Sequence, residues 1–174
     1  MENTQKKVLV AYGSRAGSTA EIAGRVAEVL NKNGFAAEAV RAGDARDVAS
    51  YSAVVLGSAV RAGKLMPEVL KFLDRNKAAV EARPFAAFVV CLTMKEQGEK
   101  SRAGAAAYLE PIRQKVKPMS EGLFAGAYNP DKVDFVMRTI MNKVIKAPAG
   151  DFRRWDEVEA WANGLVPLLG SKAK

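Results

Sequence analysis

An apolar strand pattern that runs into a glycine- and hydroxyl-rich turn, and then into an amphipathic helix, constrains this chain most. The run Val8–Tyr12 has the composition and length expected for a buried strand. A helical pattern follows from Thr19, with Ile22 and Val26 on one apolar stripe. A helix N-terminus places unpaired backbone N–H groups at the turn that precedes it. The sequence therefore predicts an anion-binding turn at the carboxyl end of the first strand.

The turn also contains the donors that a phosphate group needs, because three hydroxyls, two glycines and an arginine lie within it. Gly13 and Gly17 would let the backbone approach a ligand closely. The alternative interpretation is a plain capped helix, with Ser18 as its N-cap and Glu21 completing a capping box. That alternative does not account for the crowding of the turn. We therefore predict a phosphate site formed by Ser14, Arg15, Ala16, Gly17, Ser18 and Thr19.

The spacing of the turn excludes the two common nucleotide-binding loops. No Lys follows Gly17, as the Walker loop G-x-x-x-x-G-K-[ST] requires, and the dinucleotide pattern G-x-G-x-x-G is absent after the strand. The strand ends in Tyr-Gly-Ser, whereas a receiver domain needs acidic residues at that place. What remains is a loop for a single terminal phosphate monoester.

The segment Tyr12–Ala23, YGSRAGSTAEIA, resembles the phosphate loop of flavodoxins. Its Ser-Arg-x-Gly-x-Thr form is especially similar to the menaquinone-dependent protoporphyrinogen IX dehydrogenase branch of that family. The resemblance implies FMN as the cofactor and a flavodoxin-like α/β fold. In that fold a doubly wound, five-stranded parallel sheet has the order 2-1-3-4-5, with helices on both faces. We expect residues 1–174 to form a single FMN-binding domain.

Apolar runs alternate with helical patterns along the rest of the chain, as an α/β sheet requires. In the flavodoxin order the ligand lies at the carboxyl ends of the first and third strands. The expected strands are Lys7–Tyr12, Phe35–Arg41, Ala53–Gly57, Phe85–Leu92 and Leu123–Tyr128. The expected helices are Ser18–Lys32, one that begins near Pro67, Ser101–Val116 and Trp155–Leu169.

Two further loops are expected to complete the site. The resemblance implies that the segment after the third strand lines the flavin ring and that the segment after the fourth strand holds its other side. Arg61 is the candidate for contact with a substrate, and a solvated surface loop is the alternative for its segment. Neither loop contains the aromatic side chain with which carrier flavodoxins stack on the ring, and Cys91 is expected to end a core strand. The predicted residues are Ser58, Ala59, Val60, Arg61 and Gly63 in the first loop, and Leu92, Thr93 and Met94 in the second.

Residues 131–147 form an insert between the fifth strand and the last helix, and their pattern predicts an amphipathic helix. Apolar residues recur from Val133 to Ile145 at helical spacing, and basic residues lie on the other side. Two interpretations stay open. The stripe packs on a face of the sheet, or it lies on an anionic membrane surface or gates a quinone.

The formal net charge of +8 indicates anionic partners. Basic and aromatic residues are not interleaved as in nucleic-acid-binding proteins, so nucleic acid is not an expected partner. The chain has one Cys and no His, so we expect neither a disulfide framework nor a metal site. No signal segment or membrane-spanning run is visible, which predicts a cytoplasmic location, at most peripheral on the inner face of the membrane.

The resemblance predicts an FMN-dependent oxidoreductase similar to protoporphyrinogen IX dehydrogenase that passes electrons to a quinone. In that interpretation the positive field attracts the carboxylates of the porphyrinogen, and Arg61 is the nearest candidate contact. One alternative is a flavodoxin that carries electrons between protein partners such as a reductase and a ferredoxin. The other is a non-catalytic interaction domain with the same fold, which the intact phosphate turn disfavours.

Overall fold

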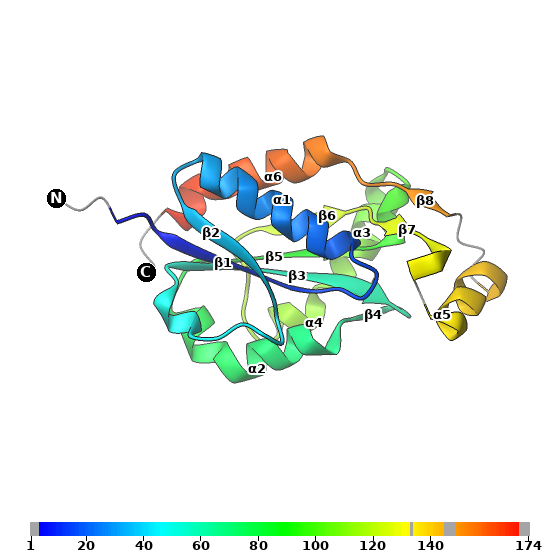
Figure 1. The fold of residues 1–174 in the computed structure, drawn as a ribbon, viewed down its shortest axis with the longest axis horizontal. Coiled ribbons are helices and arrows are strands. Elements are labelled where there is room, and N and C mark those ends of the chain that lie inside the picture. The colour runs from blue at the N-terminus through cyan, green and yellow to red at the C-terminus, as the bar shows by residue number, and fades with distance from the viewer. Residues whose placement is uncertain (1–3, 133, 145–148, 171–174) are drawn as a thin grey trace.

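A parallel five-stranded sheet forms the centre of the computed structural model, which describes residues 4–132, 134–144 and 149–170 (Figure 1). The order is β2-β1-β3-β5-β6, and β4 pairs antiparallel with the end of β3. Because β4 lies off the main path, this is the predicted order 2-1-3-4-5, which is confirmed. The strands are β1 (Lys7–Gly13), β2 (Ala36–Arg41), β3 (Ala53–Arg61), β4 (Lys64–Leu65), β5 (Phe85–Val90) and β6 (Glu121–Phe124).

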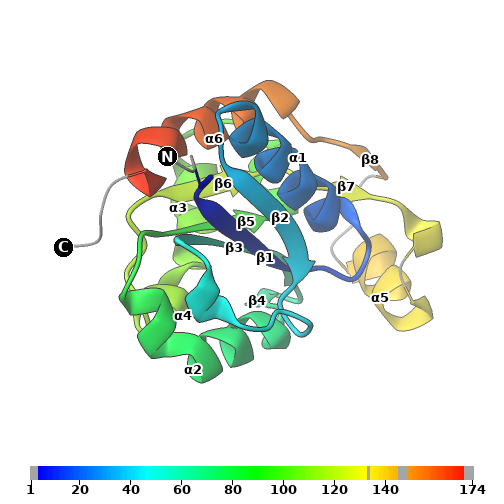
Figure 2. The same ribbon diagram turned by 60° about the vertical axis from the view of Figure 1, so that its left-hand side comes forward.

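Side chains alternate between the two faces of the sheet, as strand geometry requires. In β1, Val8 and Val10 belong to one core cluster, while Leu9 and Ala11 belong to the other. Both faces are covered, which explains why the strands are continuous apolar runs in the sequence. One face is covered by α1 (Ser18–Lys32) and α6 (Trp155–Leu169), and the other by α2 (Pro67–Glu81) and α4 (Glu110–Arg113) (Figures 1 and 2).

An aromatic cluster fixes the spacing between the sheet and α6. The Phe88 ring lies 5.8 Å from Phe124 and 5.8 Å from Trp161, measured between ring centroids. The same ring lies directly over Gly57 in β3, where an added Cβ would come within 2.0 Å of it. Gly57 is therefore required by close packing in the middle of the sheet rather than by a turn.

The prediction of one continuous helix over Ser101–Val116 is wrong. The structure contains α3 (Glu99–Ala107) and the separate short helix α4. Pro111 lies in the first turn of α4, where its missing N–H costs nothing. In the interior of a longer helix the same proline would remove a hydrogen bond and clash with the preceding turn. The break therefore follows from Pro111.

The fifth strand also differs from the prediction Leu123–Tyr128. β6 ends at Phe124, which pairs with Val90 at the end of β5, so the sheet offers no partner beyond that point. The chain then leaves the sheet and forms β7 (Ala127–Tyr128), which pairs antiparallel with β8 (Gly150–Asp151). This ribbon joins the two ends of the insert.

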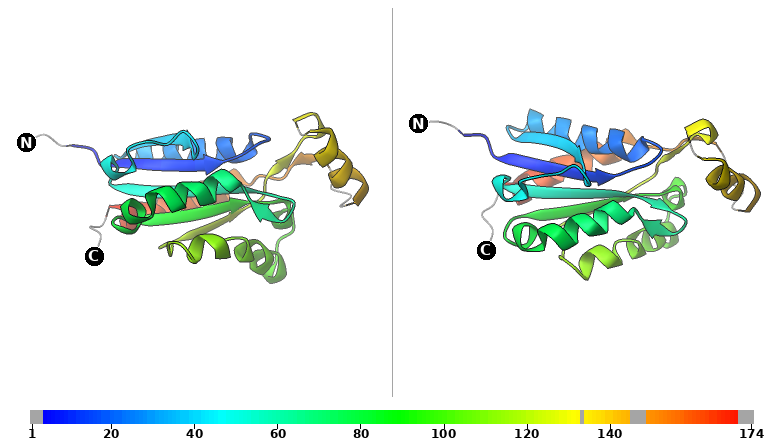
Figure 3. Two further views of the ribbon diagram at one scale, coloured as in Figure 1. Left: turned by 90° about the horizontal axis from the view of Figure 1, so that it is seen from below. Right: turned by 60° about the horizontal axis from the view of Figure 1, so that its bottom comes forward.

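The insert lies beyond the carboxyl ends of the central strands, as Figures 1 and 3 both show. It contains a 3₁₀ turn at Pro130–Lys132, helix α5 (Phe135–Thr139) and a π-helical turn at Ile140–Val144. The helix predicted over 131–147 therefore starts later and is less regular than its pattern indicates. Val133 and Ile145, the ends of the predicted stripe, lie outside the described residues.

Candidate functional site

The turn between β1 and α1 is built around a hydrogen bond from the Gly17 N–H to Ser14 Oγ, with a donor–acceptor distance of 3.1 Å. Gly17 has a φ of 95°, a left-handed conformation that glycine adopts without strain. The Arg41 guanidinium, from the end of β2, donates to the Ser14 carbonyl at 3.0 Å. The backbone of the turn is thus fixed from both sides.

Helix α1 begins at this turn without the expected cap. Gly17, and not Ser18, occupies the N-cap position, and a glycine has no side chain with which to cap the first N–H groups of the helix. The Glu21 carboxylate pairs with Arg153 instead of completing a capping box. The first N–H groups of α1 therefore point at the turn, together with the positive end of the helix dipole. This arrangement favours an anion at the turn.

Thr19 supplies the sharpest sign of a missing ligand. Its side chain is fully buried, and its Oγ1 has no hydrogen-bond partner in the part of the chain that the structure describes. A buried hydroxyl without a partner costs about 1–3 kcal/mol. A phosphate oxygen bound at the turn would be the partner that this hydroxyl lacks. The residues present therefore fit a phosphate group.

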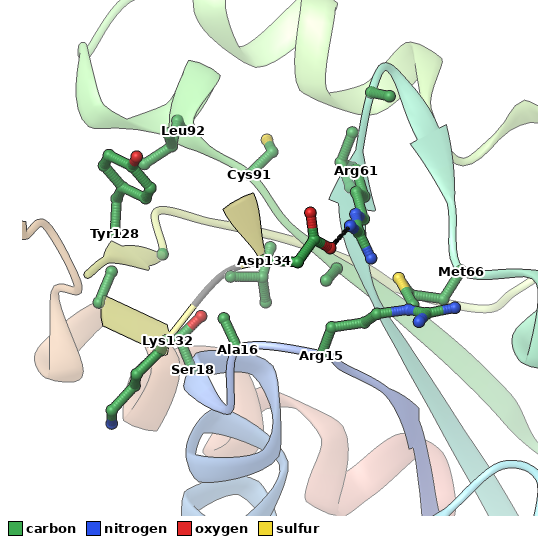
Figure 4. Close-up of a pocket in the computed structure, with 16 residues that line it drawn as sticks. Arg15, Ala16, Ser18, Arg61, Met66, Cys91, Leu92, Tyr128, Lys132 and Asp134 are labelled. Atoms are coloured by element: carbon green, nitrogen blue, oxygen red, sulfur yellow. Dashed lines mark hydrogen bonds and ion pairs between the residues drawn. The ribbon is translucent and has the colours of Figure 1, made fainter. Parts of the chain in front are cut away.

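A cleft of about 300 Å³ opens next to this turn, at the carboxyl ends of the central strands. Figure 4 shows its lining, which comes from the turn, the end of β3, the segment after β5 and the insert. Seven of the predicted site residues line it: Arg15, Ala16, Ser18, Ala59, Val60, Arg61 and Leu92. The switch-point rule and the phosphate turn thus indicate the same place.

The wall after the third strand is a strand and hairpin, not the predicted loop. β3 continues to Arg61, and β4 returns antiparallel beside it, with Arg61 opposite Lys64. Ala62 and Gly63 have φ values of 50° and 74°, as a tight turn between twisted strands requires. Gly63 is therefore at the tip of the hairpin and does not line the cleft. The hairpin gives Arg61 a rigid backbone.

Ser58 lies behind this wall rather than in it. Its fully buried hydroxyl donates to the Ala59 carbonyl at 2.8 Å and accepts from the Met66 N–H at 2.9 Å. Met66 immediately precedes α2, so Ser58 ties the end of β3 to the start of that helix. Ser58 therefore supports the cleft wall from behind.

The wall after β5 divides its residues between the cleft and the core. Leu92 faces the cleft, while Thr93 is exposed. Met94 is buried in a small core cluster, and its carbonyl accepts a hydrogen bond from Arg154 at 2.9 Å. Cys91 is buried directly after β5 and borders the cleft. Burial raises the pKa of its thiol, which disfavours a reactive thiolate.

The far wall comes from residues that the sequence analysis did not predict. Gly126, Ala127 and Tyr128 line the cleft from the segment that connects β6 to the insert. The Tyr128 hydroxyl donates to Asn142 Oδ1 at 3.0 Å, which ties β7 to the π-helical turn. Tyr128 is thus an aromatic residue in the cleft, although neither predicted loop contains one. Tyr128 lies after β6, the next strand of the sheet, whereas the resemblance had indicated only the segments after β3 and β5.

Positive charge predominates in the lining. Arg61 extends toward Asp134 and Arg15 extends toward Met66, whereas Lys132 points away from the cleft (Figure 4). The part of the lining that the structure describes has one carboxylate, that of Asp134, which forms an ion pair with Arg61. Such a lining suits an anionic ligand.

Comparisons with known proteins agree with this geometry. The model of the family described as "Flavodoxin domain" matches residues 9–154. The chain is 24% identical to protoporphyrinogen IX dehydrogenase [quinone] of Leishmania major, over 97% of this chain and 78% of that protein.

Solved structures with the same fold include a flavodoxin from the domain Archaea, with a TM-score of 0.58 and 16% identity over 95% of this chain and 99% of that one. The two-electron reduced flavodoxin of Megasphaera elsdenii has a TM-score of 0.55 and 17% identity over 90% and 98%. The flavodiiron protein of Giardia intestinalis has a TM-score of 0.51 and 16% identity, covering 92% of this chain and 38% of that one. At these identities the structural similarity shows the fold alone.

Proposed function

The chain belongs to the flavodoxin domain family, and from this premise we propose that it is an FMN-dependent oxidoreductase whose residues 1–174 form one cofactor-binding domain. The observation that carries the proposal is the buried, unpartnered hydroxyl of Thr19 beside the uncapped N-terminus of α1. In this proposal the phosphate of FMN lies in the turn of Ser14, Arg15, Ala16, Gly17, Ser18 and Thr19.

The cleft next to the turn is the proposed place of the flavin ring, which supplies the electron-transfer chemistry when bound. Ala59, Val60 and Arg61 form one wall, and Leu92 belongs to the other. Ser58 and Met94 hold these walls from behind. Gly63 lies at the tip of the hairpin, and Thr93 lies on the exposed surface next to Leu92 in the sequence. Neither residue lines the cleft. The apolar side chains exclude water from the ring, and the tight hairpin fixes the position of Arg61.

For the reaction, we propose oxidation of a porphyrinogen with a quinone as the acceptor. The supports are the name of the relative from Leishmania major and the positive lining of the cleft. In each step the macrocycle loses two hydrogen atoms and the quinone gains them as quinol. Arg61 would bind a carboxylate of the porphyrinogen through its guanidinium, a group with the right geometry for such a contact.

The test is anaerobic turnover of protoporphyrinogen with a menaquinone analogue by FMN-loaded protein, followed by the fluorescence of protoporphyrin. The rate should fall as salt rises, because salt screens the attraction between carboxylates and the cleft. The Arg61→Gln protein should have a higher KM. If there is no turnover at low salt but a ferredoxin or reductase reduces the protein rapidly, the electron-carrier function replaces this one.

The insert supplies a proposed contact with an anionic membrane surface. Phe135 is 77% exposed and Val136 is 67% exposed, while Lys132, Arg138 and Lys143 lie close by in the sequence. Exposed apolar side chains among basic ones suit a surface of anionic lipid, where a quinone is also available. No helix of the described residues is long and apolar enough to cross a bilayer. We therefore propose a cytoplasmic protein that associates peripherally with the inner face of the membrane.

A further inference from the structure

The ion pair between Arg61 and Asp134 belongs to the lining of the cleft, next to the proposed place of the flavin ring. Arg61 comes from the end of β3 and Asp134 from the insert, just before α5 (Figure 4). Arg61 Nη2 donates to Asp134 Oδ2. Among the described residues that line the cleft, Asp134 is the one with a carboxylate, and it is paired with Arg61.

The ion pair is exposed enough for a ligand to displace Asp134 from Arg61. The Arg61 side chain is 30% exposed and that of Asp134 is 55% exposed, so water screens their attraction. The backbone of Arg61 is fixed by the hairpin, whereas Asp134 belongs to the insert at the edge of the molecule. A ligand carboxylate that reaches Arg61 would replace one charge-assisted hydrogen bond by another.

We propose that Asp134 is a specificity-determining residue, which occupies Arg61 in place of a substrate carboxylate. A ligand must displace Asp134 before its own carboxylate can bind, and a neutral ligand gains nothing from doing so. Asp134 therefore sets how strongly the site prefers a carboxylate ligand over a neutral one, and it weakens that preference. This inference rests on the proposed function, because it concerns the substrate of that site.

The test measures the dissociation constant of protoporphyrin IX and of its uncharged dimethyl ester, in the same detergent, for five proteins. These are the parent, Asp134→Asn, Arg61→Gln, the double variant, and Asp134→Glu as the control that keeps the charge. Asp134→Asn should bind protoporphyrin about two- to fivefold more tightly, the range expected for a partly exposed pair. Binding of the ester should not change, and Asp134→Glu should resemble the parent.

The gain from Asp134→Asn should disappear when Arg61 is already Gln, because Asp134 acts through Arg61. Equal or weaker protoporphyrin binding by folded Asp134→Asn would overturn the proposal, and so would a gain that persists without Arg61. A purely structural role would affect the acid and the ester alike, and that result would overturn it too.

A second probe separates this inference from the proposed reaction. Glutarate, a simple dicarboxylate, is titrated against the protein as isolated, with the side-chain NMR signal of Arg61 as the readout. If no protein binds protoporphyrin but Asp134→Asn binds glutarate more tightly than the parent, the porphyrin function fails and the inference stands. If glutarate binds the parent and Asp134→Asn equally, the inference fails whatever the porphyrin result.

Discussion

At the scale of the residue, Thr19 decides most about the site, because a buried hydroxyl without a partner destabilises a protein that binds nothing there. The sequence showed Thr19 among the residues of the turn. It could not show that the hydroxyl is buried, since burial depends on the packing of α1 against the sheet. The structure therefore adds to the predicted phosphate motif one specific atom, Thr19 Oγ1, which lacks a hydrogen-bond partner among the described residues.

Replacing Thr19 with Val should have opposite effects on the empty and the loaded protein. Val has the same shape without the hydroxyl, so the free energy of unfolding without FMN should stay the same or rise by up to about 1 kcal/mol. FMN should bind about 10- to 100-fold more weakly, because a hydrogen bond to a charged phosphate is lost. Urea unfolding and a flavin-fluorescence titration measure the two effects. An unchanged FMN affinity in the folded variant would contradict the assignment of Thr19.

Gly57 provides a test of the core at the same scale. Gly57→Ala would place a Cβ within 2.0 Å of the Phe88 ring, so we expect a loss of about 3 kcal/mol or more in the free energy of unfolding. The matched control is Gly164→Ala in α6, where nothing lies within 4 Å of the new atom. That change should stabilise the protein by up to about 1 kcal/mol through helix propensity. Similar melting temperatures for the two variants would show that Phe88 is not packed as described.

At the scale of the element, the sequence predicted those strands and helices that are marked by their own apolar periodicity and by the residues at their ends. The first strand and α1 were predicted almost to the residue, because periodicity and the flanking glycines mark their limits. The break before α4 was missed although Pro111 signals it. The ribbon of β7 and β8 could not be predicted, since its two strands are more than 20 residues apart and pair only in the folded chain. The far wall of the cleft, including Tyr128, was missed for the same reason.

The insert is the element whose function is most open to direct measurement. A Phe135→Ser, Val136→Ser double variant should keep its stability, because both side chains are largely exposed. Its binding to anionic vesicles should fall about tenfold or more, since apolar side chains gain free energy when buried in the interface. Cosedimentation with anionic and neutral vesicles measures the difference. Met119→Ser is the control, as Met119 is another exposed apolar residue, 52% accessible and outside the insert. Equal binding of the parent protein to both kinds of vesicle would contradict a preference for an anionic surface, and no binding to either would contradict a membrane role.

At the scale of the whole molecule, the sheet order brings every part of the site to one edge. The turn after β1, the hairpin after β3 and the segment after β5 meet at the carboxyl ends of adjacent strands, and the insert closes the fourth side. The strand order was predictable because the resemblance and the crossover rule agree. The net charge of +8 also belongs to this scale, and in the proposed function it would attract anionic ligands.

The most direct test of the account compares the affinities of FMN and riboflavin for the parent protein, because the two ligands differ only in the phosphate. Quenching of flavin fluorescence gives both dissociation constants under the same conditions. We expect FMN to bind at least about 100-fold more tightly, through several charge-assisted hydrogen bonds at the turn. In the Thr19→Val protein the ratio of the two affinities should be smaller. Equal affinities for FMN and riboflavin would contradict a phosphate site between β1 and α1.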